Sequence, residues 1–373
     1  MLGWGTAASA APGWTVVPTV DPSAGTNVLN AVAVRGPADA WSVGNFTAPD
    51  QDADGLNMLT ERWNGTTWTQ VGSPAVRHQD ESLLAVSASS VNDAWAVGFT
   101  KAVGAAGRFP LAAHWNGSSW TIVPTPTQTG GSKSTLNGVV DLSPTNAWAV
   151  GRSRSATALV EHWNGTAWSI VPVPTPAGAA TSQLAAISAL SPTNIWAVGS
   201  VVNIVNTAVQ NRTLVEHWNG TAWSIVTSRN ATNSNLLTGV AAVAANDVWA
   251  VGYTIATDGS NQPDKTLVEH WNGSAWSIVA SPSPASNDTL SGVAARSATD
   301  VWAVGFRQDR SGPIPIDRTL TEHWNGATWS VVASPNVGAN DNLLNGVSAT
   351  TGDVWTVGSS DVFAHTLALR EIG

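Results

Sequence analysis

Residues 236–284 read LLTGVAAVAANDVWAVGYTIATDGSNQPDKTLVEHWNGSAWSIVASPSP, one copy of a repeat that runs along the chain. The stretch contains four short runs of strand-forming residues, at 236–243, 248–253, 266–271 and 275–279. The last two runs flank Asn272-Gly273, and Asn-Gly between β-rich runs is the strongest short-range signal of a hairpin, because both residues tolerate positive φ. A Pro-Ser-Pro segment ends the unit, since proline cannot donate to a strand ladder. The unit is therefore predicted to form four antiparallel strands.

The 21 tryptophans of this 373-residue chain follow the same repeat. Seven stand in a W-x-V-G motif, at steps of 54, 53, 48, 53, 53 and 53 residues: Trp41, Trp95, Trp148, Trp196, Trp249, Trp302 and Trp355. Twelve form pairs five residues apart around Asn-Gly: Trp63/Trp68, Trp115/Trp120, Trp163/Trp168, Trp218/Trp223, Trp271/Trp276 and Trp324/Trp329. Self-similarity at about 40–50 residues is typical of propellers and solenoids. We therefore predict an all-β, seven-bladed β-propeller with four antiparallel strands in each blade.

The two ends of the chain predict how the ring closes. The last unit stops after a third strand, within residues 366–373, and residues 13–18 carry the fourth-strand pattern G-W-T-V-V-P. We expect the N-terminal strand to complete the last blade, which removes free sheet edges. The small apolar strand belongs innermost, where the blades converge. The tryptophans, each able to bury about 150–250 Å², are expected to pack between blades.

The motifs carry a family resemblance. The order of strand, W-A-V-G, long loop and V-E-H-W-N-G-x-x-W resembles kelch-type repeats, with tryptophan where kelch usually has tyrosine, and it is similar to tectonin repeats. The resemblance covers residues 11–373 and implies a Trp-rich propeller of a secreted bacterial type. It departs from kelch because the double glycine is single, as in Gly252-Tyr253. W-N-G-T-A-W also resembles the Asp-box of sialidase-like propellers without its aspartate. These families range from lectins to oxidases to scaffolds, so function must be argued from a site.

Composition limits the classes of function. Lys and Arg number 16 against 25 Asp and Glu, and the resulting net charge of −9 argues against nucleic-acid binding, which needs clustered cations. The absence of cysteine excludes disulfides, thiolate zinc sites and thiol nucleophiles. No run of 18 apolar residues exists, so no membrane span is predicted. Charged residues make up only 11% of the chain, against about 25% ordinarily, and such a polar, weakly charged surface favours an extracellular protein.

The first ten residues differ from the repeat. MLGWGTAASA ends in small residues, Ala8-Ser9-Ala10, which resemble a secretory cleavage site. We interpret residues 1–10 as a remnant of a signal peptide, which favours a secreted protein; a tag or an ordinary flexible start is the alternative. Residues 11–373 are predicted to form a single propeller domain.

A repeated Glu-His pair looks catalytic at first sight. It recurs at one position in four units: Glu161-His162, Glu216-His217, Glu269-His270 and Glu322-His323. A catalytic dyad is normally single, so a repeated polar pair is better explained by buried hydrogen bonds that tie strands and turns together. Just before the W-x-V-G tryptophan, Asp or Asn recurs as well, and we expect these residues to bond their own backbone in a turn.

A possible calcium loop stands in the first unit. Asp50, Asp52, Asp54 and Gly55, followed after five residues by Glu61, match the spacing D-x-D-x-D-G-x5-E. Alternating carboxylates suit a hard cation, and loops of this kind in integrin-type propellers resemble this segment. The alternative is a solvated acidic loop, because Glu61 also occupies the repeated third-strand position.

The segments that differ between units are the other candidate site. They follow the second strand of each unit and should emerge on the same face as the connections between blades, where loops on a rigid scaffold commonly carry function. The residues expected on this rim are Arg108, Phe109, Tyr253, Asp258, Asp264, Phe306, Arg307, Asp309, Arg310, Phe363 and His365. Aromatic, acidic and basic side chains together would suit a glycan or a protein ligand. Ordinary variable loops are the alternative.

Three functions are compatible with this pattern. The leading hypothesis is a secreted, non-enzymatic binding propeller, lectin-like or protein-binding, because the units are regular and no single catalytic constellation is visible. The second is a glycoside hydrolase or lyase, whose carboxylates would come from the loops: Asp258, Asp264, Asp309 and Asp317. A galactose-oxidase-like cofactor cannot form without cysteine, and the only tyrosine, Tyr253, lies in no acid–base cluster. The third is a structural or assembly module, or a consensus-like design.

Overall fold

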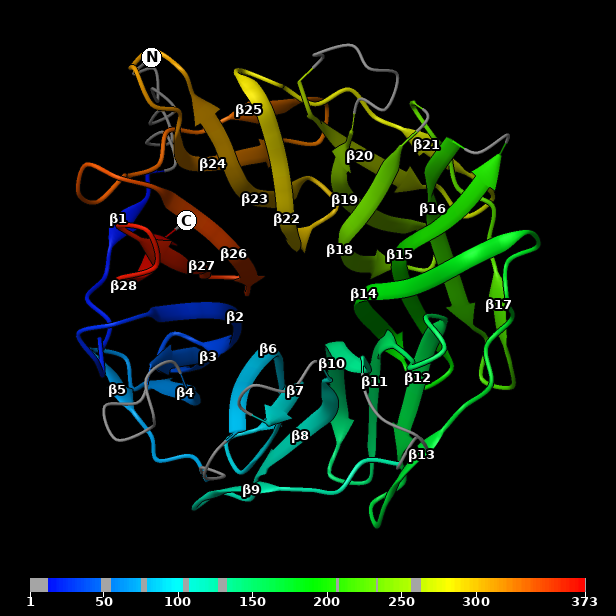
Figure 1. Ribbon diagram of the computed structural model, residues 1–373, viewed down its shortest axis with the longest axis horizontal. Helices are drawn as coiled ribbons and strands as arrows, with labels where there is room; N and C mark the ends of the chain where they lie inside the picture. The colour runs from blue at the N-terminus through cyan, green and yellow to red at the C-terminus, as the bar shows by residue number, and fades with distance from the viewer. Residues whose placement is uncertain are drawn as a thin grey trace, which may run out of the picture.

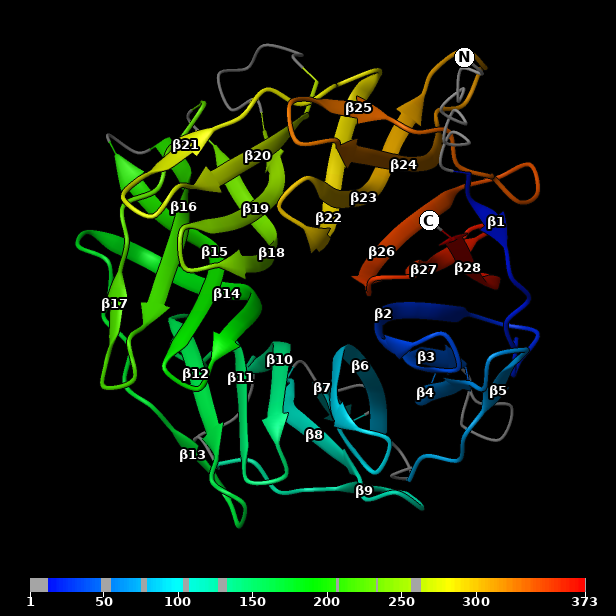
Figure 2. The same cartoon turned by 180° about the vertical axis from the view of Figure 1, so that it is seen from behind.

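The computed structural model describes residues 13–47, 55–74, 79–102, 107–126, 133–205, 208–232, 234–255 and 263–372. These residues form seven four-stranded antiparallel sheets in a ring (Figure 1), and Figure 2 shows the ring from behind. The prediction of a seven-bladed β-propeller is confirmed. Within the described ranges, no helix is long and apolar enough to cross a membrane.

The blades are numbered along the chain. Blades 1 to 6 consist of β2–β5, β6–β9, β10–β13, β14–β17, β18–β21 and β22–β25, and blade 7 of β26–β28 with β1. The inner strands are β2 (Asn27–Gly36), β6 (Gln79–Ser90), β10 (Thr135–Ser143), β14 (Ala179–Ser191), β18 (Asn235–Ala244), β22 (Ser286–Ser297) and β26 (Asn342–Ala349). The second strands are β3 (Asp39–Thr47), β7 (Asp93–Ala102), β11 (Asn146–Arg152), β15 (Asn194–Val205), β19 (Asp247–Thr254), β23 (Asp300–Asp309) and β27 (Asp353–Ser360).

The third and fourth strands complete each blade toward the perimeter. The third strands are β4 (Leu56–Trp63), β8 (Phe109–Trp115), β12 (Ala158–Trp163), β16 (Ala208–Trp218), β20 (Lys265–Trp271), β24 (Ile316–Trp324) and β28 (His365–Ile372). The outer strands are β5 (Trp68–Gln70), β9 (Trp120–Ile122), β13 (Trp168–Ile170), β17 (Trp223–Ile225), β21 (Trp276–Ile278), β25 (Trp329–Val331) and β1 (Thr15–Val16). The outer edges are short, and short edge strands offer little surface for aggregation.

The glycine of the W-x-V-G motif is required by the close approach of two strands. A Cβ atom on Gly252 would lie 1.9 Å from the carbonyl oxygen of Leu236 on the inner strand, and the inner strand bulges there, between Leu237 and Gly239. In the Asn-Gly turn, only Gly273 has positive φ, at +94°. Asn272 does not share this positive φ. Its side chain stabilises the turn instead, because Oδ1 accepts hydrogen bonds from the backbone N–H groups of Ser274 and Ala275, at 3.0 Å each.

The tryptophans pack between neighbouring blades, as predicted. Trp41 of blade 1 meets Trp115 and Trp120 of blade 2, with ring centroids 4.9 and 5.0 Å apart. The same three-ring cluster forms at six of the seven junctions. Each cluster lies within a buried apolar core shared by two blades, and edge-to-face rings add about 0.5–1.5 kcal/mol per pair to their burial.

The junction between blades 6 and 7 is different. β1 pairs antiparallel with β28, with Val16 opposite Leu369, so the N-terminal strand completes the last blade as predicted. Across this junction Trp302 of blade 6 meets one tryptophan of blade 7, Trp14, with ring centroids 5.1 Å apart. Glu371 stands where other blades have the first tryptophan of a pair, and its carboxylate accepts from the guanidinium of Arg296. Both charged side chains are buried, at 2% and 10% exposure.

Candidate functional site

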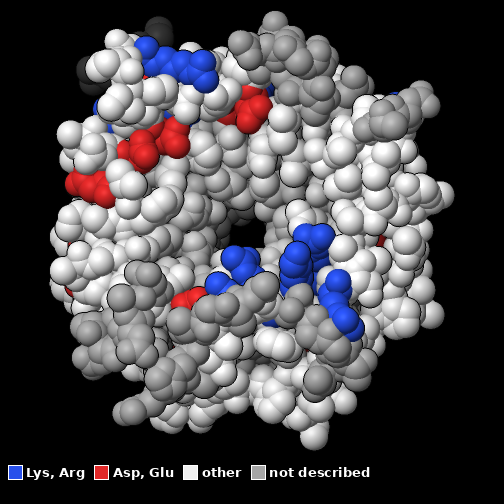
Figure 3. All heavy atoms as spheres, viewed as in Figure 1, with Lys and Arg blue, Asp and Glu red and all other residues white. Residues whose placement is uncertain are grey.

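The hairpins between second and third strands all end on one side of the ring, together with the connections between blades. Four of them reach the start of the following inner strand: backbone bonds run from Ser134 N to Arg108 O, Ser182 N to Ala156 O, Asp288 N to Asp264 O and Asn27 N to Phe363 O, at 2.7–3.2 Å. We call this side the loop face (Figure 3) and the side of the Asn-Gly turns the turn face. The expectation that loops and connections share a face is therefore confirmed.

The predicted rim residues lie on four different blades. In blade 2, the guanidinium of Arg108 lies 4.0 Å from the ring centroid of Phe99, a cation–π contact. Phe109 beside it is 46% exposed. In blade 7, Phe363 is 43% exposed and lies in a left-handed turn, while His365 Nδ1 bonds Asp21 Oδ2 at 2.8 Å.

Blade 5 contributes Tyr253 and Asp264, and Asp258 lies outside the described residues. Burial raises the pKa of the Tyr253 hydroxyl, and the nearby Asp264 carboxylate raises it further. Burial also raises the pKa of Asp264 itself. The backbone N–H of Asp264 donates to Asn287 Oδ1 at 3.1 Å, so this hairpin is fixed to blade 6.

Blade 6 carries Phe306, Arg307, Asp309 and Arg310 on one long hairpin, β23–β24. Asp309 Oδ1 accepts from the backbone N–H of Ser311 at 2.9 Å, and bonds to Ser311 hold the pKa of Asp309 below its usual range. Arg310 Nε donates to a neighbouring glutamine, Gln308, at 2.8 Å. None of the described rim residues lines the cavity of about 480 Å³ that lies beside blade 3.

The calcium prediction falls mostly outside the described residues. Asp50, Asp52 and Asp54 are not among them. Glu61 is fully buried on β4, and its Oε1 accepts from the backbone N–H of Val20 at 3.1 Å. Burial raises its pKa to about 8. The described part of the chain holds no cluster of three or more potential metal-binding side chains, and calcium binding stays a prediction.

The histidines of the repeated Glu-His pairs are structural. His270 Nε2 bonds Asp247 Oδ1 at 2.8 Å, and its ring stacks on Trp249 with centroids 4.3 Å apart. The equivalent histidines of blades 2, 3, 4 and 6 make the same bond at 2.7–3.0 Å. The recurring Asp and Asn thus accept from histidine across the blade, where a bond to their own backbone was expected. Where the acceptor is asparagine, burial lowers the pKa of His162 and His217.

The glutamates of those pairs are more unusual. Glu61 and Glu269 each accept one backbone N–H, from Val20 and Arg229. The side chains of three others have no hydrogen-bond partner within the described ranges, and burial raises the pKa of each to about 8: Glu161, Glu216 and Glu322. The expected hydrogen bonds are therefore absent for these three.

Proline explains the difference between the two groups of glutamates. Val20 and Arg229 stand four residues after the last residue of an outer strand. The same place in the connections leading to Glu161, Glu216 and Glu322 holds proline: Pro126, Pro174 and Pro282. Proline has no N–H to donate, so these carboxyl groups lack the backbone bond, and burial is the main cause that raises the pKa of each to about 8.

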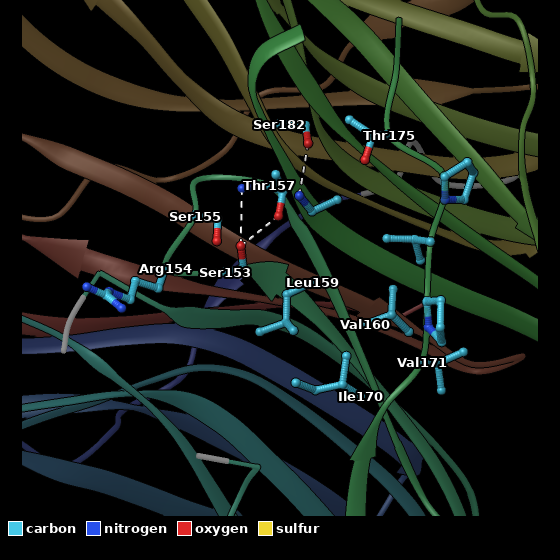
Figure 4. A pocket seen from close by; sticks show the side chains of 14 residues that line it. Ser153, Arg154, Ser155, Thr157, Leu159, Val160, Ile170, Val171, Thr175 and Ser182 are labelled. Carbon is cyan, nitrogen blue, oxygen red and sulfur yellow. Dashed lines mark hydrogen bonds between the residues drawn. The ribbon is translucent and has the colours of Figure 1, made fainter. Parts of the chain in front are cut away.

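A cavity of about 480 Å³ opens beside blade 3 (Figure 4). It lies between the β11–β12 hairpin, β13 with its connection to blade 4, and Ser182 of β14. Sequence reasoning did not identify it, although a signal exists: the step from Trp148 to Trp196 is 48 residues, whereas the other steps are 53 or 54. The missing residues are those of the hairpin, and the cavity lies beside it.

Comparisons with known proteins agree on the fold alone. No family model and no curated protein sequence matches the chain. Among solved structures, it is similar to YCF48 bound to D1 peptide, with 15% identity, a TM-score of 0.58, and coverage of 98% of this chain and 99% of that one. It is also similar to the WD40 β-propeller domain of Doa1, with 11% identity, a TM-score of 0.57, and coverage of 96% and 97%.

Proposed function

We propose that this propeller is a binding protein that holds a polypeptide segment on its loop face. The carrying observation is that described hairpins place exposed aliphatic or phenylalanine side chains there: Phe109, Ile204, Val205, Val209, Ile314, Val362 and Phe363. Ile314, at 71%, is the most exposed of these side chains and has the most surface for a partner to cover. The peptide bound to the structurally similar YCF48 supports a peptide-binding role.

The exposed aliphatic and phenylalanine side chains of the loop face suit a protein ligand better than a glycan. Sugars are held by flat aromatic faces together with polar groups, and in the described part of the chain no tryptophan belongs to the exposed large apolar residues. β-Branched side chains on hairpins instead match the apolar core of a protein interface. A lectin-like function is the alternative outcome of the test below. Secretion is retained as part of the proposal and would be tested by N-terminal mass analysis of protein from the native host.

The test is a selection of random 12-residue peptides displayed on phage, followed by hydrogen exchange of the complex with the best peptide. We expect enriched sequences, and slower exchange in the hairpins of the loop face. The double variant I204S/V209S, in the long hairpin of blade 4, should weaken binding about tenfold or more. The matched control is I122S/I278S, which removes two exposed apolar residues from outer strands. Failure to enrich any peptide, or equal losses in both variants, would contradict the proposal, and binding only to a glycan array would favour a lectin.

A further inference from the structure

The cavity of blade 3 has an apolar wall and a hydroxyl-bearing rim. Ile170, Val171 and Val173 form the accessible part of the wall, with Leu159 and Val160 buried behind it, and Figure 4 shows hydroxyl side chains along the opposite side. Ser153 Oγ bonds Thr157 Oγ1 at 2.7 Å and also accepts the N–H of Thr157, which stiffens the hairpin. Ser182 Oγ accepts the backbone N–H of Ala158 at 2.9 Å. These bonds hold the rim in place before a ligand arrives, which lowers the entropic cost of binding.

The surface around this cavity is cationic although the chain as a whole carries a charge of −9. Between residues 133 and 246 there are three carboxylates, Asp141, Glu161 and Glu216, and all are buried. The cations of the same range are Lys133, Arg152, Arg154, Arg212 and Arg229. All five stand at loop-face ends of strands or in the adjoining hairpins and connections. The three residues of this range outside the described ones are uncharged in sequence.

The opposite part of the ring has the reverse balance. Figure 3 shows Lys and Arg gathered beside the mouth of the central channel and a second group of them over blade 6, whereas most visible Asp and Glu lie over blades 6 and 7. An acidic segment would therefore be attracted to blades 3 and 4 and repelled from blades 6 and 7. Such complementarity fixes the place and register of a partner more than its affinity.

We infer that blades 3 and 4 receive an acidic polypeptide segment and that one aliphatic side chain of this segment enters the cavity. The inference rests on the proposed function, and it adds the charge of the partner and the position of its anchor. The volume and apolar wall accept a leucine-sized side chain with part of its backbone. The hydroxyl groups of the rim face that backbone, and Arg152 and Arg154 lie beside it for flanking carboxylates.

Nucleic acid would use the same cations but not the same cavity. Five cations on one sector of an acidic protein give weak phosphate binding, and single strands also need exposed aromatic platforms. An aliphatic cavity offers no stacking surface. We therefore expect a 12-nucleotide single-stranded DNA to bind more weakly than an acidic peptide, and the opposite order would overturn the inference.

The composition of the peptides selected on phage tests the inference directly. We expect Asp and Glu to be enriched on both sides of a Leu, Ile, Val or Met that recurs at one position. Binding of the best peptide should weaken with added salt, because exposed ion pairs are screened. Enriched peptides that are neutral or basic would overturn the inference while leaving peptide binding by the loop face intact. An absence of enriched peptides would remove the proposed function as well.

Two matched pairs of variants locate the acidic peptide. R152Q/R154Q should weaken its binding at least about tenfold, whereas K265Q/R310Q, which removes two exposed cations of the loop face in blades 5 and 6, should not. T175W places a large side chain in the exposed connection that borders the cavity, and T227W is the control in the next connection. T175W should lower the affinity of the peptide but not that of its Leu→Ser version. Equal effects within either pair would overturn the inference.

Discussion

Blades 3 and 7 have the two shortest hairpins when strands and loop are counted together, but the cavity lies beside only the hairpin of blade 3. The step is 15 residues from Trp148 to Trp163 and 16 from Trp355 to Glu371, against 20 or 22 in the other blades. Five residues, 153–157, join β11 to β12, and four, 361–364, join β27 to β28. Beside blade 3 the shortening leaves a cavity of about 480 Å³. In blade 7 the connection to blade 1 folds against the hairpin, because Asp21 Oδ1 accepts from the N–H and hydroxyl of Thr366 at 2.7 and 2.9 Å.

The composition of the two connections accounts for the difference. Pro172 and Pro176 after blade 3 match Pro18 and Pro22, but Pro174 stands at the place of Val20 and removes its N–H donor, and Thr175 stands at the place of Asp21. The connection after blade 3 therefore lacks both the Asp21 carboxylate and the Val20 N–H that fix the connection after blade 7. A short hairpin produces a cavity only when the neighbouring connection cannot bond to it.

The largest effect is expected where blade 7 meets blade 6. Blade 3 meets blade 2 through three tryptophan rings, whereas the blade 7 junction combines Trp14 with the buried pair Arg296–Glu371. Arg296→Ala should lower the free energy of unfolding by about 3–5 kcal/mol, because it leaves a buried carboxylate without its partner. Urea denaturation measures this.

A double variant distinguishes loss of the ion pair from loss of packing. R296V/E371W gives this junction the residues of the junction between blades 5 and 6, where Val243 and Trp324 occupy the equivalent places. We expect it to recover most of the stability lost in Arg296→Ala. If the double variant is less stable than Arg296→Ala, the ion pair contributes more to this junction than the neutralisation of two buried charges.

The second effect concerns the folded connection of blade 7. Asp21→Ala should destabilise the protein by about 1.5–3 kcal/mol, since hydrogen bonds to a charged group are lost. Thr175→Ala, the equivalent change beside blade 3, should stay within about 0.5 kcal/mol. Comparable losses in the two variants would mean that Asp21 does not hold the connection down.

The third effect depends on pH. Blade 3 buries Glu161, with a pKa of about 8, where blade 7 has Leu369. Between its unfolded pKa of about 4.5 and its folded pKa of about 8, the folded state holds a proton that the unfolded state releases, so stability falls as pH rises through this window. Glu161→Gln should be more stable than the parent at pH 9 by about 1–3 kcal/mol.

This gain should shrink as the pH is lowered toward 4.5, because both states of the parent then hold the proton. Urea denaturation of both proteins at pH 5, 7 and 9 measures it. A constant difference across the three pH values would contradict titration of this carboxyl group as the cause.

The smallest effect is expected in the blade 7 hairpin itself. Asp361, Val362 and Phe363 all have positive φ, of 51°, 58° and 69°. Val362→Gly should relieve about 1–2 kcal/mol of strain and lose about 0.5–1 kcal/mol through entropy, a net gain below about 1 kcal/mol. Val209→Gly, in an exposed strand of blade 4, should instead destabilise. A loss in Val362→Gly would indicate that its side chain packs usefully.

Periodicity in the sequence predicted most of the fold and little of the site. Trp249, Gly252 and Asn272 recur with their neighbours, so strand order, blade number and ring closure could be read from the repeat. The partnerless carboxyl groups depend on whether one connection residue is proline, as at Pro174, and this matters only once the chain is folded. The cavity lies beside a hairpin that is shorter than its counterparts, and residues that are missing from a sequence cannot be singled out as a motif. Rim residues such as Arg108 and His365 were named individually, but their partners, Phe99 and Asp21, belong to other segments of the chain.

The two-residue strand β1 also has a mechanical consequence. Opposing forces applied near Thr15 and Arg370 would act on the few backbone bonds between β1 and β28, while the other six blades carry no load. The ring should therefore open at blade 7 at low force and leave six blades folded. A protein tethered through both ends would lengthen first by this small step, well before any blade unravels.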